Sequence, residues 1–473
     1  MFFRSVKRAV TLLTGMICLG YFGSVIADTK PVTAVHQYNV IIIGAGAAGL
    51  AAAQDLYQHG VKDVLVLEAR DRIGGRVWTI HPWGAATDLG ASWIHRSNNN
   101  PLALLAKKHA VDTVSTIYSL ENPVNKFSSF DIYDNNGIKI SPHEMKSALE
   151  LINKFQADIA ENKFHLKENA SFEDAAITFT KQEHLQGKDL QIFDFIAKDM
   201  IESDMAADMK QVSLTAGMAV HSRVSGKDLL PQGGYIRVFS ELVKNISISL
   251  NNPVTAINYG QDGITVVTKK GLYHSKYAIV TLPLGVLKAG TVKFSPELPK
   301  EKLASIKQLR MGFLNKIYLF FDNLFWNPDI EWISVMPNKE QPKEHYEALN
   351  LYKFVKQPIL LFFSAGSFSE ETESWTDKKI IDNVMHHLQL IYGKNVPHPS
   401  AYLITRWGKD PFAHGSYSYP TVGSSVEDYK NLAAPVADKL FFAGEATSTT
   451  DPSTVHGAYM SGVAAAELVM SKL

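Results

Sequence analysis

A glycine-rich turn near the start of the chain is the feature that most constrains its fold. The apolar run Val40 to Ile43 leads into Gly44-Ala45-Gly46-Ala47-Ala48-Gly49 and an alanine-rich segment, and a second apolar run, Val64 to Leu67, is followed by Glu68. This order of strand, glycines, helix, strand and acid predicts a βαβ unit that binds a dinucleotide. Glycines alone would be weak evidence, because small residues also pack ordinary corners between a helix and a strand.

The residues of this turn have separate predicted tasks. Gly44 permits the tight turn, Gly46 lets the main chain approach a pyrophosphate, and Gly49 lets the helix pack closely on the sheet. The helix N-terminus then meets the anion. Glu68 is expected to accept hydrogen bonds from the adenosine ribose, and an acid at this position disfavours a 2′-phosphate.

A segment near the other end of the chain looks like the second half of the same site. Leu440-Phe441-Phe442-Ala443-Gly444-Glu445 predicts an apolar strand that ends in a glycine and a carboxylate, and a helix is expected from about Thr454. Glu445 is predicted to bind the cofactor; the alternative is a carboxylate that only satisfies the helix dipole. Closure of one site by both ends of a chain is more typical of a flavoprotein than of a simple two-domain dehydrogenase.

Length and composition limit the class of protein. The chain has 473 residues, of which 46% are hydrophobic, and no formal net charge, so it can bury a large core and should form two or more domains. Lysines and arginines are scattered and there is one cysteine, so neither a nucleic-acid partner nor a zinc-type metal site is expected.

The first 27 residues are predicted to be a signal peptide. Basic residues precede an uncharged, mostly apolar stretch from Ala9 to Val25, and cleavage is expected after Ala27, followed by export to the periplasm or outside the cell. An uncleaved membrane anchor is the alternative. Once the segment is removed, no stable membrane insertion is expected. Loss of Cys18 would leave no thiol for a disulfide or a cysteinyl bond to a cofactor.

Periodicity predicts both helices and strands in the remainder. From Pro101 to about Leu214 the pattern is mainly helical, with apolar residues three and four positions apart. Strand patterns follow, with a turn at Asp262-Gly263 between the first two. The expected strands are Val254 to Ile257, Ile264 to Val267, Ala278 to Thr281 and Lys316 to Phe321.

Five motifs occur in a fixed order along the chain. They are Arg72-Ile73-Gly74-Gly75-Arg76, Asp88-Leu89-Gly90-Ala91-Ser92-Trp93, Asn315-Lys316-Ile317, Thr405-Arg406-Trp407 and Phe442-Ala443-Gly444-Glu445. In this combination the chain resembles the flavin-containing amine oxidases from about Tyr38 to its C-terminus. Three further segments are most similar to polyamine oxidases and the related histone demethylases. These are Gly90-Ala91-Ser92-Trp93-Ile94-His95, Pro283-Leu284-Gly285-Val286-Leu287-Lys288 and Val455-His456-Gly457-Ala458.

The resemblance implies an α/β (α+β) fold with two domains. A Rossmann-like FAD-binding domain would comprise residues 36–100, 226–300 and 412–473, and an interleaved substrate-binding domain of mixed sheet plus helices would comprise residues 101–225 and 301–411. It also implies FAD and a small-molecule amine whose carbon-nitrogen bond is oxidised while O2 is reduced to hydrogen peroxide. Because the mature chain would have no thiol, the FAD is expected to be held non-covalently. Polyamines such as spermine, spermidine or their acetylated forms are the expected substrates.

Residue roles follow from the resemblance. Lys316 would hold a water at the reactive flavin nitrogen and assist oxygen chemistry; from the sequence pattern alone, a strand-edge lysine that discourages aggregation is the alternative. Arg72 and Arg76 flank two glycines and could meet the cofactor phosphates and the flavin edge. The expected cofactor-binding residues are Gly44, Gly46, Ala47, Ala48, Gly49, Glu68, Ala69, Arg70, Arg76, Gly90, Ala91, Ser92, Trp93, Val254, Trp407, Gly444, Glu445, Thr454 and Val455.

Four residues are expected at the substrate. His95 matches a histidine of the substrate tunnel, Glu202 a tunnel carboxylate that attracts a cation, and Tyr419 an aromatic wall facing the flavin, while Thr454 stands where some relatives place a second aromatic wall. An ordinary loop histidine and a solvated helix face are the alternatives for the first two.

The sequence does not decide between polyamines and other substrates of the same oxidation reaction. Arg96 departs from the glycine usual in polyamine oxidases, and Arg96 or Arg310 could clamp the carboxylate of an L-amino acid. Oxidation of monoamines or L-amino acids, or binding of polyamines without turnover, are therefore alternatives. A histone demethylase is disfavoured by the export signal and by the lack of an appended chromatin module.

Overall fold

The computed structural model describes residues 36–116, 130–219, 224–338, 340, 343–344 and 346–473. The predicted signal peptide, including Cys18, lies outside the described residues. Within the described ranges, no helix has the length and apolar character needed to cross a membrane.

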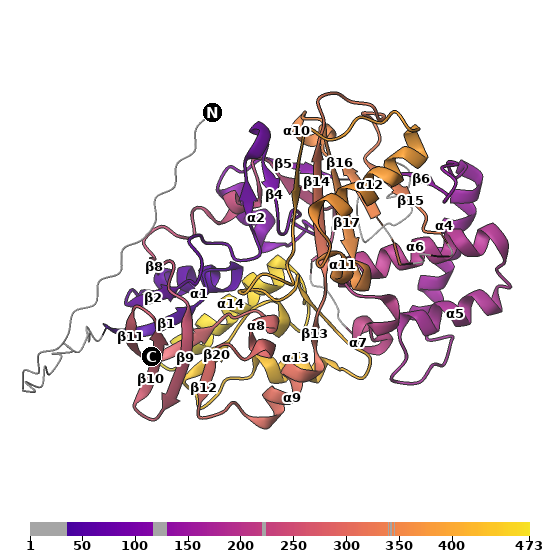
Figure 1. Cartoon of the computed structure of the whole chain (residues 1–473). Helices are drawn as coiled ribbons and strands as arrows, with labels where there is room; N and C mark the ends of the chain where they lie inside the picture. Colours follow the sequence, from indigo (N-terminus) through magenta and orange to yellow (C-terminus); the bar gives the residue numbers. More distant parts are fainter. Residues whose placement is uncertain (1–35, 117–129, 220–223, 339, 341–342, 345) are drawn as a thin grey trace, which may run out of the picture.

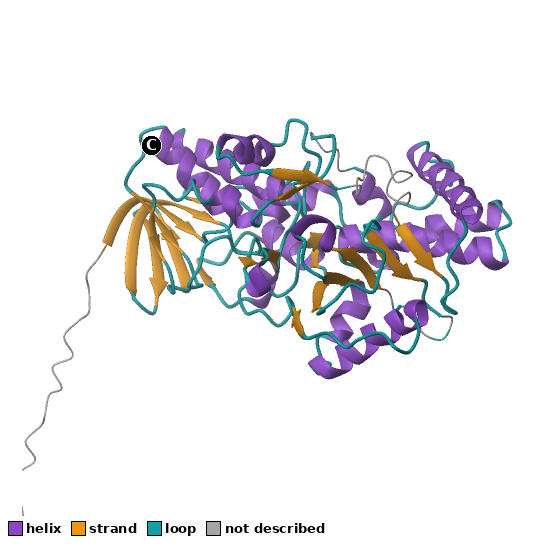
Figure 2. Ribbon diagram, turned by 90° about the horizontal axis from the view of Figure 1, so that it is seen from above, coloured by secondary structure: helices purple, strands orange, loops and turns teal. Residues whose placement is uncertain are grey.

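An eight-stranded sheet forms one half of the molecule (Figures 1 and 2). Its order is β12-β9-β10-β11-β1-β2-β8, and β20 also pairs with β11. The strands are β1 (His36–Ile43), β2 (Val64–Leu67), β8 (Ser247–Ser249), β9 (Val254–Gly260), β10 (Gly263–Thr268), β11 (Gly271–Val280), β12 (Lys293–Ser295) and β20 (Leu440–Phe442). Strands β1 and β20 both pair in parallel with β11, where Ile43 and Phe442 align with Val280. The predicted meeting of the two ends of the chain is confirmed.

The burial of these strands follows from their sequences. All four residues of β2 are buried, as expected for a parallel strand covered on both faces. In β10 the buried Ile264, Val266 and Thr268 alternate with half-buried residues, as expected for an antiparallel strand. Strands β9 and β10 are joined by a turn at Gln261-Asp262, one position earlier than the predicted turn at Asp262-Gly263.

Two helices from opposite ends of the chain pack together on one face of this sheet. They are α1 (Ala47–Gln58) and α14 (Val455–Met470), and their buried residues share one hydrophobic cluster. A Cβ at Gly49 would lie 1.9 Å from the carbonyl oxygen of Gly44, and one at Gly462 would lie 2.1 Å from that of Ala48. Only glycine permits these approaches, so these two positions determine how closely α1 packs on its own turn and on α14.

Further helices complete this half. On the opposite face, α8 (Leu284–Ala289), α9 (Lys300–Gln308) and α13 (Val426–Ala433) contribute to a second cluster. Helix α2 (Pro101–Lys108) joins the cluster of α1 and α14. The domain boundaries proposed from the sequence stay a prediction. Helix α2 and most of α9 belong to the segments assigned there to the substrate-binding domain, but both helices pack with the first sheet.

A six-stranded sheet organises the other half. Its order is β18-β14-β17-β16-β15-β6. The strands are β6 (Phe130–Tyr133), β14 (Leu314–Phe320), β15 (Trp332–Val335), β16 (Tyr346–Asn350), β17 (Ile359–Ala365) and β18 (Ala401–Ile404). Helix α12 (Asp377–Tyr392) packs on one face, and the other face belongs to the cluster that contains α4 (Pro142–Ala160), α5 (Phe172–Gln182) and α6 (Gly187–Met205).

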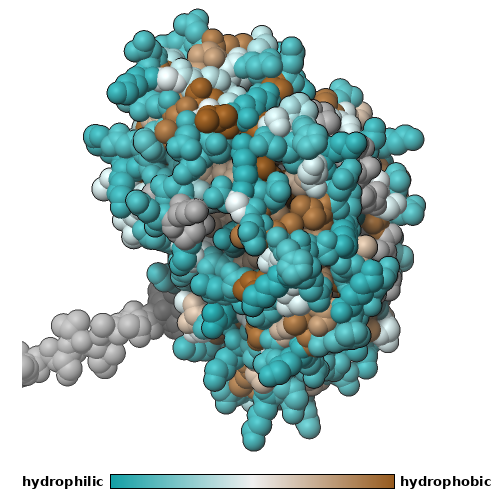
Figure 3. All heavy atoms as spheres, turned by 90° about the vertical axis from the view of Figure 1, so that its right-hand side faces the viewer, coloured by the Kyte–Doolittle hydropathy of each residue, from teal (hydrophilic) through white to brown (hydrophobic). Residues whose placement is uncertain are grey.

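The region predicted as mainly helical also holds a strand. Helices α4, α5 and α6 agree with the periodicity, but β6 lies within the same region and pairs in parallel with β15 at the edge of the six-stranded sheet. Its four residues are too few for a periodic signal, and only the long-range pairing identifies them as a strand. On the face drawn in Figure 3, hydrophilic side chains predominate and hydrophobic ones form small separate spots, as is normal for a protein surface.

Shorter strands and helices lie outside the two large sheets. They are β3 (Thr79–Ile80), β4 (Thr87–Asp88), β5 (Thr113–Ser115), β7 (Leu229–Pro231), β13 (Arg310–Met311), β19 (Ser418–Tyr419), α7 (Leu214–Met218), α10 (Tyr352–Val355) and α11 (Gly366–Thr372). The overall arrangement is the mixed α/β architecture expected for a two-domain flavin-binding amine oxidase.

Candidate active site

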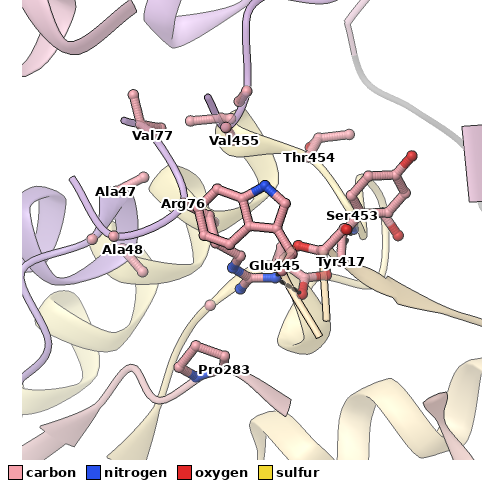
Figure 4. Close-up of a pocket in the computed structure, with 18 of the residues that line it drawn as sticks. Ala47, Ala48, Arg76, Val77, Pro283, Tyr417, Glu445, Ser453, Thr454 and Val455 are labelled. Carbon is pink, nitrogen blue, oxygen red and sulfur yellow. Dashed lines mark hydrogen bonds and ion pairs between the residues drawn. The ribbon is translucent and has the colours of Figure 1, made fainter. Parts of the chain in front are cut away.

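A cavity of about 770 Å³ is lined by residues from both halves of the molecule (Figure 4). Its volume lies in the upper part of the range of ligand and cofactor sites. All the predicted cofactor-binding residues except Gly49 line it, and so do His95, Lys316 and Thr454. Motifs from both ends and the middle of the sequence therefore contribute to one cavity wall.

The first end of the cavity fits a dinucleotide. Gly46 precedes α1, and a Cβ placed there would come no closer than 4.0 Å to a neighbouring atom, so this position is open toward the cavity. Among the described residues, no side chain caps the N-terminus of α1, whose first N–H groups are left for an anion. Gly49 instead packs against Gly44, the task predicted from its position in the motif.

Glu68 is fixed by the turn that it faces. Its Oε2 accepts a hydrogen bond of 2.7 Å from Ala45 N, and its Oε1 accepts one of 2.8 Å from Arg70 N. The carboxylate is 5% exposed and lines the cavity. Each oxygen keeps a further lone pair, so the geometry suits the predicted contact with ribose hydroxyls.

Arg70 has a partner that the sequence did not reveal. Its guanidinium donates two hydrogen bonds, of 2.8 and 2.7 Å, to Asp410, and it lies 5.3 Å from the centre of the Phe412 ring. The ion pair joins the end of the βαβ unit to the segment after β18, and Phe412 also lines the cavity. Nothing in the sequence near Asp410 marks it as this partner.

Arg76 and Glu445 connect the two distant motifs, as Figure 4 shows. Arg76 Nη1 donates to Glu445 Oε1 at 2.8 Å and to the carbonyl oxygen of Ser416 at 3.0 Å. Glu445 Oε2 accepts from Ser418 Oγ at 2.5 Å and from Ser453 N at 3.0 Å. Glu445 is therefore more than a helix-terminal charge: it holds three chain segments together where they border the cavity.

The expectation that Arg72 meets the cofactor is not supported by its position. Arg72 is not among the residues that line the cavity; its Nη1 donates to the carbonyl oxygens of Ile73 and Gly75, and its guanidinium lies 4.3 Å from the Trp78 ring centre. Burial, together with the nearby charge of Arg70, lowers the pKa of Arg72 to about 10. Arg72 stabilises the turn that presents Arg76.

Lys316 is buried on an interior strand of the six-stranded sheet, so the strand-edge alternative is wrong. Strand β14 lies between β18 and β17, and Lys316 is 3% exposed. Its Nζ donates to the carbonyl oxygens of Asp88 and Gly90 at 2.7 and 2.6 Å and contacts Ser92 Oγ at 2.6 Å. A lysine inside a sheet needs such partners, because an isolated buried charge is very costly.

Burial changes the acid-base behaviour of this lysine. Desolvation lowers the pKa of Lys316 to about 7, and the Asp88 carboxylate opposes part of that change. As an ammonium, Nζ donates to all three neighbours; as a neutral amine, it donates to the two carbonyls and accepts from the Ser92 hydroxyl. Nζ has a hydrogen-bond partner for each of its donors and acceptors in both protonation states. It can therefore lose its proton near neutral pH without leaving a buried polar group unpaired. Lys316 is predicted to hold a water at Nζ. Such a water would have to replace one of the three present partners of Nζ.

The loop from Gly90 to Trp93 is held from two sides. Lys316 binds it from β14, and Trp407 Nε1 donates to the carbonyl oxygen of Leu89 at 3.1 Å. A Cβ at Gly90 would lie 1.8 Å from the carbonyl oxygen of Arg76, which fixes the loop against the turn before it. The motifs that contain Arg76, Lys316 and Trp407 thus all contact this loop in the cavity wall.

His95 is paired rather than an ordinary loop histidine. Its Nδ1 lies 2.8 Å from Asp228 Oδ2, and the other oxygen of Asp228 accepts from Arg96 N at 2.7 Å. Burial alone would lower the pKa of His95, but Asp228 and, less strongly, Asp204 raise it, and the net shift is upward. Asp228 is fully buried, and no pattern in the sequence around it indicates this role.

Glu202 does not reach the cavity, and the prediction of a substrate role for it is wrong. Its carboxylate accepts a hydrogen bond of 3.0 Å from Met209 N and is not among the lining residues, whereas Asp204 is. Both residues belong to α6, and two positions along a helix turn a side chain by about 200°, to the opposite face. Of these two acidic residues of α6, Asp204 is the one that lines the cavity.

Tyr419 is also placed differently from the prediction. It pairs with Arg310 in the short sheet of β13 and β19 and borders a second cavity of about 320 Å³. Tyr417, two residues earlier, lines the main cavity and donates to the carbonyl oxygen of Ser203 at 2.6 Å. The chain turns at Gly415 and the strand begins only at Ser418, so strand alternation does not extend back to Tyr417. Arg310 borders the second cavity as well, so of the two arginines considered for a substrate carboxylate only Arg96 lines the main cavity.

Aromatic side chains form the far end of the cavity. Trp93 stacks on Trp332 with ring centres 6.1 Å apart, and Phe363 lies 5.9 Å from each of the two. Lys316 Nζ is 5.6 Å from the Phe363 ring centre. Such a wall favours an amine, which packs on the rings when neutral and is attracted by their faces when charged.

The start of α14 forms the remaining wall. Thr454 caps this helix, accepting from Gly457 N at 2.9 Å, and the predicted helix start is confirmed. Thr454 and Val455 line the cavity, as Figure 4 shows, so the positive end of the helix dipole points at it. With small residues at 453 and 454, this wall is not aromatic.

Comparison with known proteins agrees with this geometry. Residues 47–470 match the model of a family described as flavin containing amine oxidoreductase. The chain is 36% identical over 437 residues to polyamine oxidase 4 of Oryza sativa subsp. japonica, covering 91% of this chain and 88% of the relative. It is 35% identical over 440 residues to polyamine oxidase 2 of Arabidopsis thaliana, covering 91% and 87%. Lysine-specific histone demethylase 1 homolog 3 of Oryza sativa subsp. japonica is 34% identical over 460 residues, which are 93% of this chain and 54% of that protein.

Proposed function

The chain belongs to the flavin-containing amine oxidoreductase family and is an FAD-dependent amine oxidase, and we propose that its substrates are polyamines such as spermine, spermidine or their acetylated forms. The observation that carries the proposal is the continuity of one cavity from the dinucleotide turn at Gly46 to the aromatic wall at Phe363. His95 and Asp204 line the same cavity, and the relatives of similar length are named polyamine oxidases.

The cavity is expected to favour the neutral form of the bound amine, which is the form that can be oxidised. A carbon-nitrogen bond is oxidised by loss of hydride only when the nitrogen lone pair is free, although amines are cationic in water. An apolar wall of Trp93, Trp332 and Phe363 disfavours the charged form and lowers the pKa of the bound amine, as burial does for Lys316. When bound, FAD supplies the hydride acceptor and the subsequent reduction of O2.

The protein residues bind and orient rather than react covalently. Gly46 and the start of α1 would hold the pyrophosphate, Glu68 the ribose, and the start of α14 the carbonyl edge of the flavin that gains negative charge on reduction. Lys316 fixes the loop from Gly90 to Trp93 and, with a pKa of about 7, can release or take up a proton at Nζ near neutral pH. It is the one residue to which we assign a catalytic role.

A substrate panel tests the proposal. Purified protein should be yellow, and peroxide should be released with spermine, spermidine or their acetylated forms at a higher kcat/KM than with monoamines. Turnover confined to L-amino acids would overturn the polyamine assignment. A colourless protein that does not take up added FAD under native conditions would overturn the flavin site itself.

An L-amino-acid oxidase is the alternative favoured by a specific residue. Arg96 lines the main cavity beside His95 and could bind a carboxylate in bidentate geometry. The same panel separates the two, since an α-carboxylate would then be required for turnover. Anaerobic bleaching of the flavin by spermine separates either oxidase from a protein that only binds polyamines.

Export belongs to the proposal as well. It is supported by the basic start, apolar stretch and cleavage site within residues 1–27. The N-terminal sequence of the protein recovered from its native host would begin at Asp28 if the segment is removed. Recovery of the intact N-terminus in the membrane fraction would favour the anchor instead.

A further inference from the structure

Met205 places an oxidisable sulfur at the wall of the main cavity. It is the last residue of α6 and is half-buried. Among the described residues it is the one methionine that lines this cavity, and it also packs against the hydrophobic cluster of α4, α5 and α6. A thioether is apolar and flexible, so it fits such a wall, but peroxide converts it to a polar sulfoxide.

The end of α6 is connected to the wall that would hold the flavin edge. Tyr417 donates a hydrogen bond of 2.6 Å to the carbonyl oxygen of Ser203, two residues before Met205. Ser418, which follows Tyr417, donates to Glu445 Oε2 at 2.5 Å. Both Tyr417 and Glu445 line the cavity, as Figure 4 shows. Two short hydrogen bonds thus connect the helix end that carries Met205 to the cofactor wall.

Close packing fixes the main chain at this position. Phe313 N donates to the carbonyl oxygen of Ala206 at 2.7 Å. A Cβ at Gly312 would lie 2.5 Å from that oxygen and 2.8 Å from the carbonyl oxygen of Met205. The helix end therefore stays against the segment before β14, and Met205 stays at the cavity wall.

The oxidase reaction supplies an oxidant inside this cavity. Each turnover reduces one O2 to H2O2 where the cofactor and the amine meet. One molecule confined to about 770 Å³ corresponds to a local concentration of about 2 M. In every turnover the sulfur of Met205 is therefore exposed, for a short time, to far more peroxide than a methionine on the outer surface.

We propose that Met205 is a modification site, which the peroxide made in the main cavity oxidises to methionine sulfoxide. A lone pair of Sδ attacks one peroxide oxygen, the O–O bond breaks, and the other oxygen leaves with both protons as water. Sulfur is oxidised by two electrons and H2O2 is reduced by two. The polar sulfoxide makes the wall less apolar and weakens binding of the neutral amine, so activity is lost as turnovers accumulate.

Mass spectrometry after turnover tests the proposal with internal controls. The enzyme oxidises spermine in the presence of excess catalase, which destroys peroxide that reaches the solution. Trypsin then releases residues 199–210 as one peptide that contains Met200, Met205 and Met209. Met205 should carry at least about fivefold more sulfoxide than Met200, which is also half-buried on α6 but does not line the cavity.

Peroxide added from solution should give a different pattern. In resting enzyme without amine, Met218, which is 40% exposed, should be oxidised faster than Met205. Incubation with spermine in the absence of O2 should leave Met205 unoxidised, because no peroxide forms. Together these two controls separate peroxide made in the cavity from peroxide that enters it.

Leucine variants connect the modification to activity. With catalase present, the rate of each variant is divided by its own initial rate and followed against the number of turnovers. Met205→Leu should complete at least about threefold more turnovers than wild type before it loses half its rate, because leucine has a similar volume and no sulfur. Met200→Leu is the matched control and should lose activity as wild type does.

The outcomes keep this inference separate from the choice of substrate. Equal sulfoxide at Met200 and Met205 under catalase would overturn it, and so would identical inactivation of wild type and Met205→Leu. If spermine releases no peroxide, the polyamine proposal fails. The same measurements are then made with the amine of highest kcat/KM, and the expected pattern at Met205 is unchanged, because the modification needs peroxide and no particular amine.

Discussion

Arg76 and Glu445 are joined by an ion pair of 2.8 Å between Nη1 and Oε1, although one follows the first βαβ unit and the other follows the last strand of the chain. Only 23% of the Arg76 side chain and 6% of the Glu445 side chain are exposed. Both residues line the main cavity. The wall of the cofactor site therefore depends on a contact between the two ends of the chain.

Glu445→Gln should lower both stability and FAD retention. The variant leaves Arg76 partly buried without its counter-charge, which should reduce the free energy of unfolding by about 2 kcal/mol, less than the loss for a fully buried pair because Arg76 is partly exposed. Thermal unfolding with and without added FAD measures this effect. Asp382→Asn removes an exposed ion pair with Lys378 and should change stability by less than about 0.5 kcal/mol. Equal effects of the two substitutions would contradict the prediction.

Two glycines of the first turn should respond to alanine in different ways. Gly46→Ala adds a methyl group that meets only open cavity, so the apo protein should unfold normally while FAD binding weakens about tenfold or more. Gly49→Ala places the methyl group against the Gly44 carbonyl and should reduce stability even without cofactor. Flavin fluorescence titration and thermal unfolding of the apo proteins separate the two effects. Weakened folding of Gly46→Ala would show that this position is structural.

The His95–Asp228 pair should make stability depend on pH. The pKa of His95 is raised in the folded protein, so its stabilising effect is fully present below the pKa of an unfolded histidine, about 6.5, and is lost as pH rises through the folded value. The difference in unfolding free energy between wild type and His95→Gln should therefore be larger at pH 5.5 than at pH 9. Chemical denaturation at both pH values measures it.

Asp228→Asn provides the matched variant for this pair. The asparagine can still accept from Arg96 N, but it no longer raises the pKa of His95. In that background, His95→Gln should produce a difference that hardly varies between pH 5.5 and pH 9. A pH dependence that persists unchanged would assign it to another group.

Lys316→Met should affect the oxygen reaction more than amine oxidation. With a pKa of about 7, Lys316 is mainly an ammonium below neutral pH and mainly a neutral amine above it, so the reoxidation rate of the reduced enzyme should change with a midpoint near pH 7. The methionine variant should reoxidise more slowly, by about tenfold or more on the scale of general acid-base effects, and without that midpoint. Stopped-flow absorbance measures both half-reactions.

Ser92→Ala is the control for that prediction. It removes one of the three groups around Nζ and leaves the carbonyl acceptors of Asp88 and Gly90 in place. The midpoint should persist in this variant, because the amine itself is still present. A wild-type reoxidation rate that is independent of pH would contradict the assignment to Lys316.

Local patterns in the sequence were sufficient for the parts of the site that one segment builds. The turn around Gly46, the acid Glu68 and the helix that starts after Thr454 each depend on residues close together in the chain, and each lies where predicted. Motif resemblance located the loop at Gly90 and the lysine at 316, whose burial no local pattern indicates.

The errors arose where a side chain's direction depends on tertiary structure. Glu202 and Asp204 are both acidic and two residues apart, and only the orientation of α6 decides which one faces the cavity. Tyr417 and Tyr419 are separated by the start of a strand, so only the fold places one on the main cavity and the other on a second one. The partners Asp228 and Asp410 lie far in sequence from His95 and Arg70, and no spacing rule connects them.

The parallel pairing of β1 and β20 with β11 has a consequence for biosynthesis. Synthesis reaches β20 and α14 only after the other described strands and helices, so until then the earlier segments have an incomplete sheet and an uncovered α1. Pairing between such remote segments is slow compared with local folding, and it cannot begin before β20 has been made. We therefore expect flavin binding only after β20 and α14 are synthesised, and chains truncated before β20 should not acquire colour.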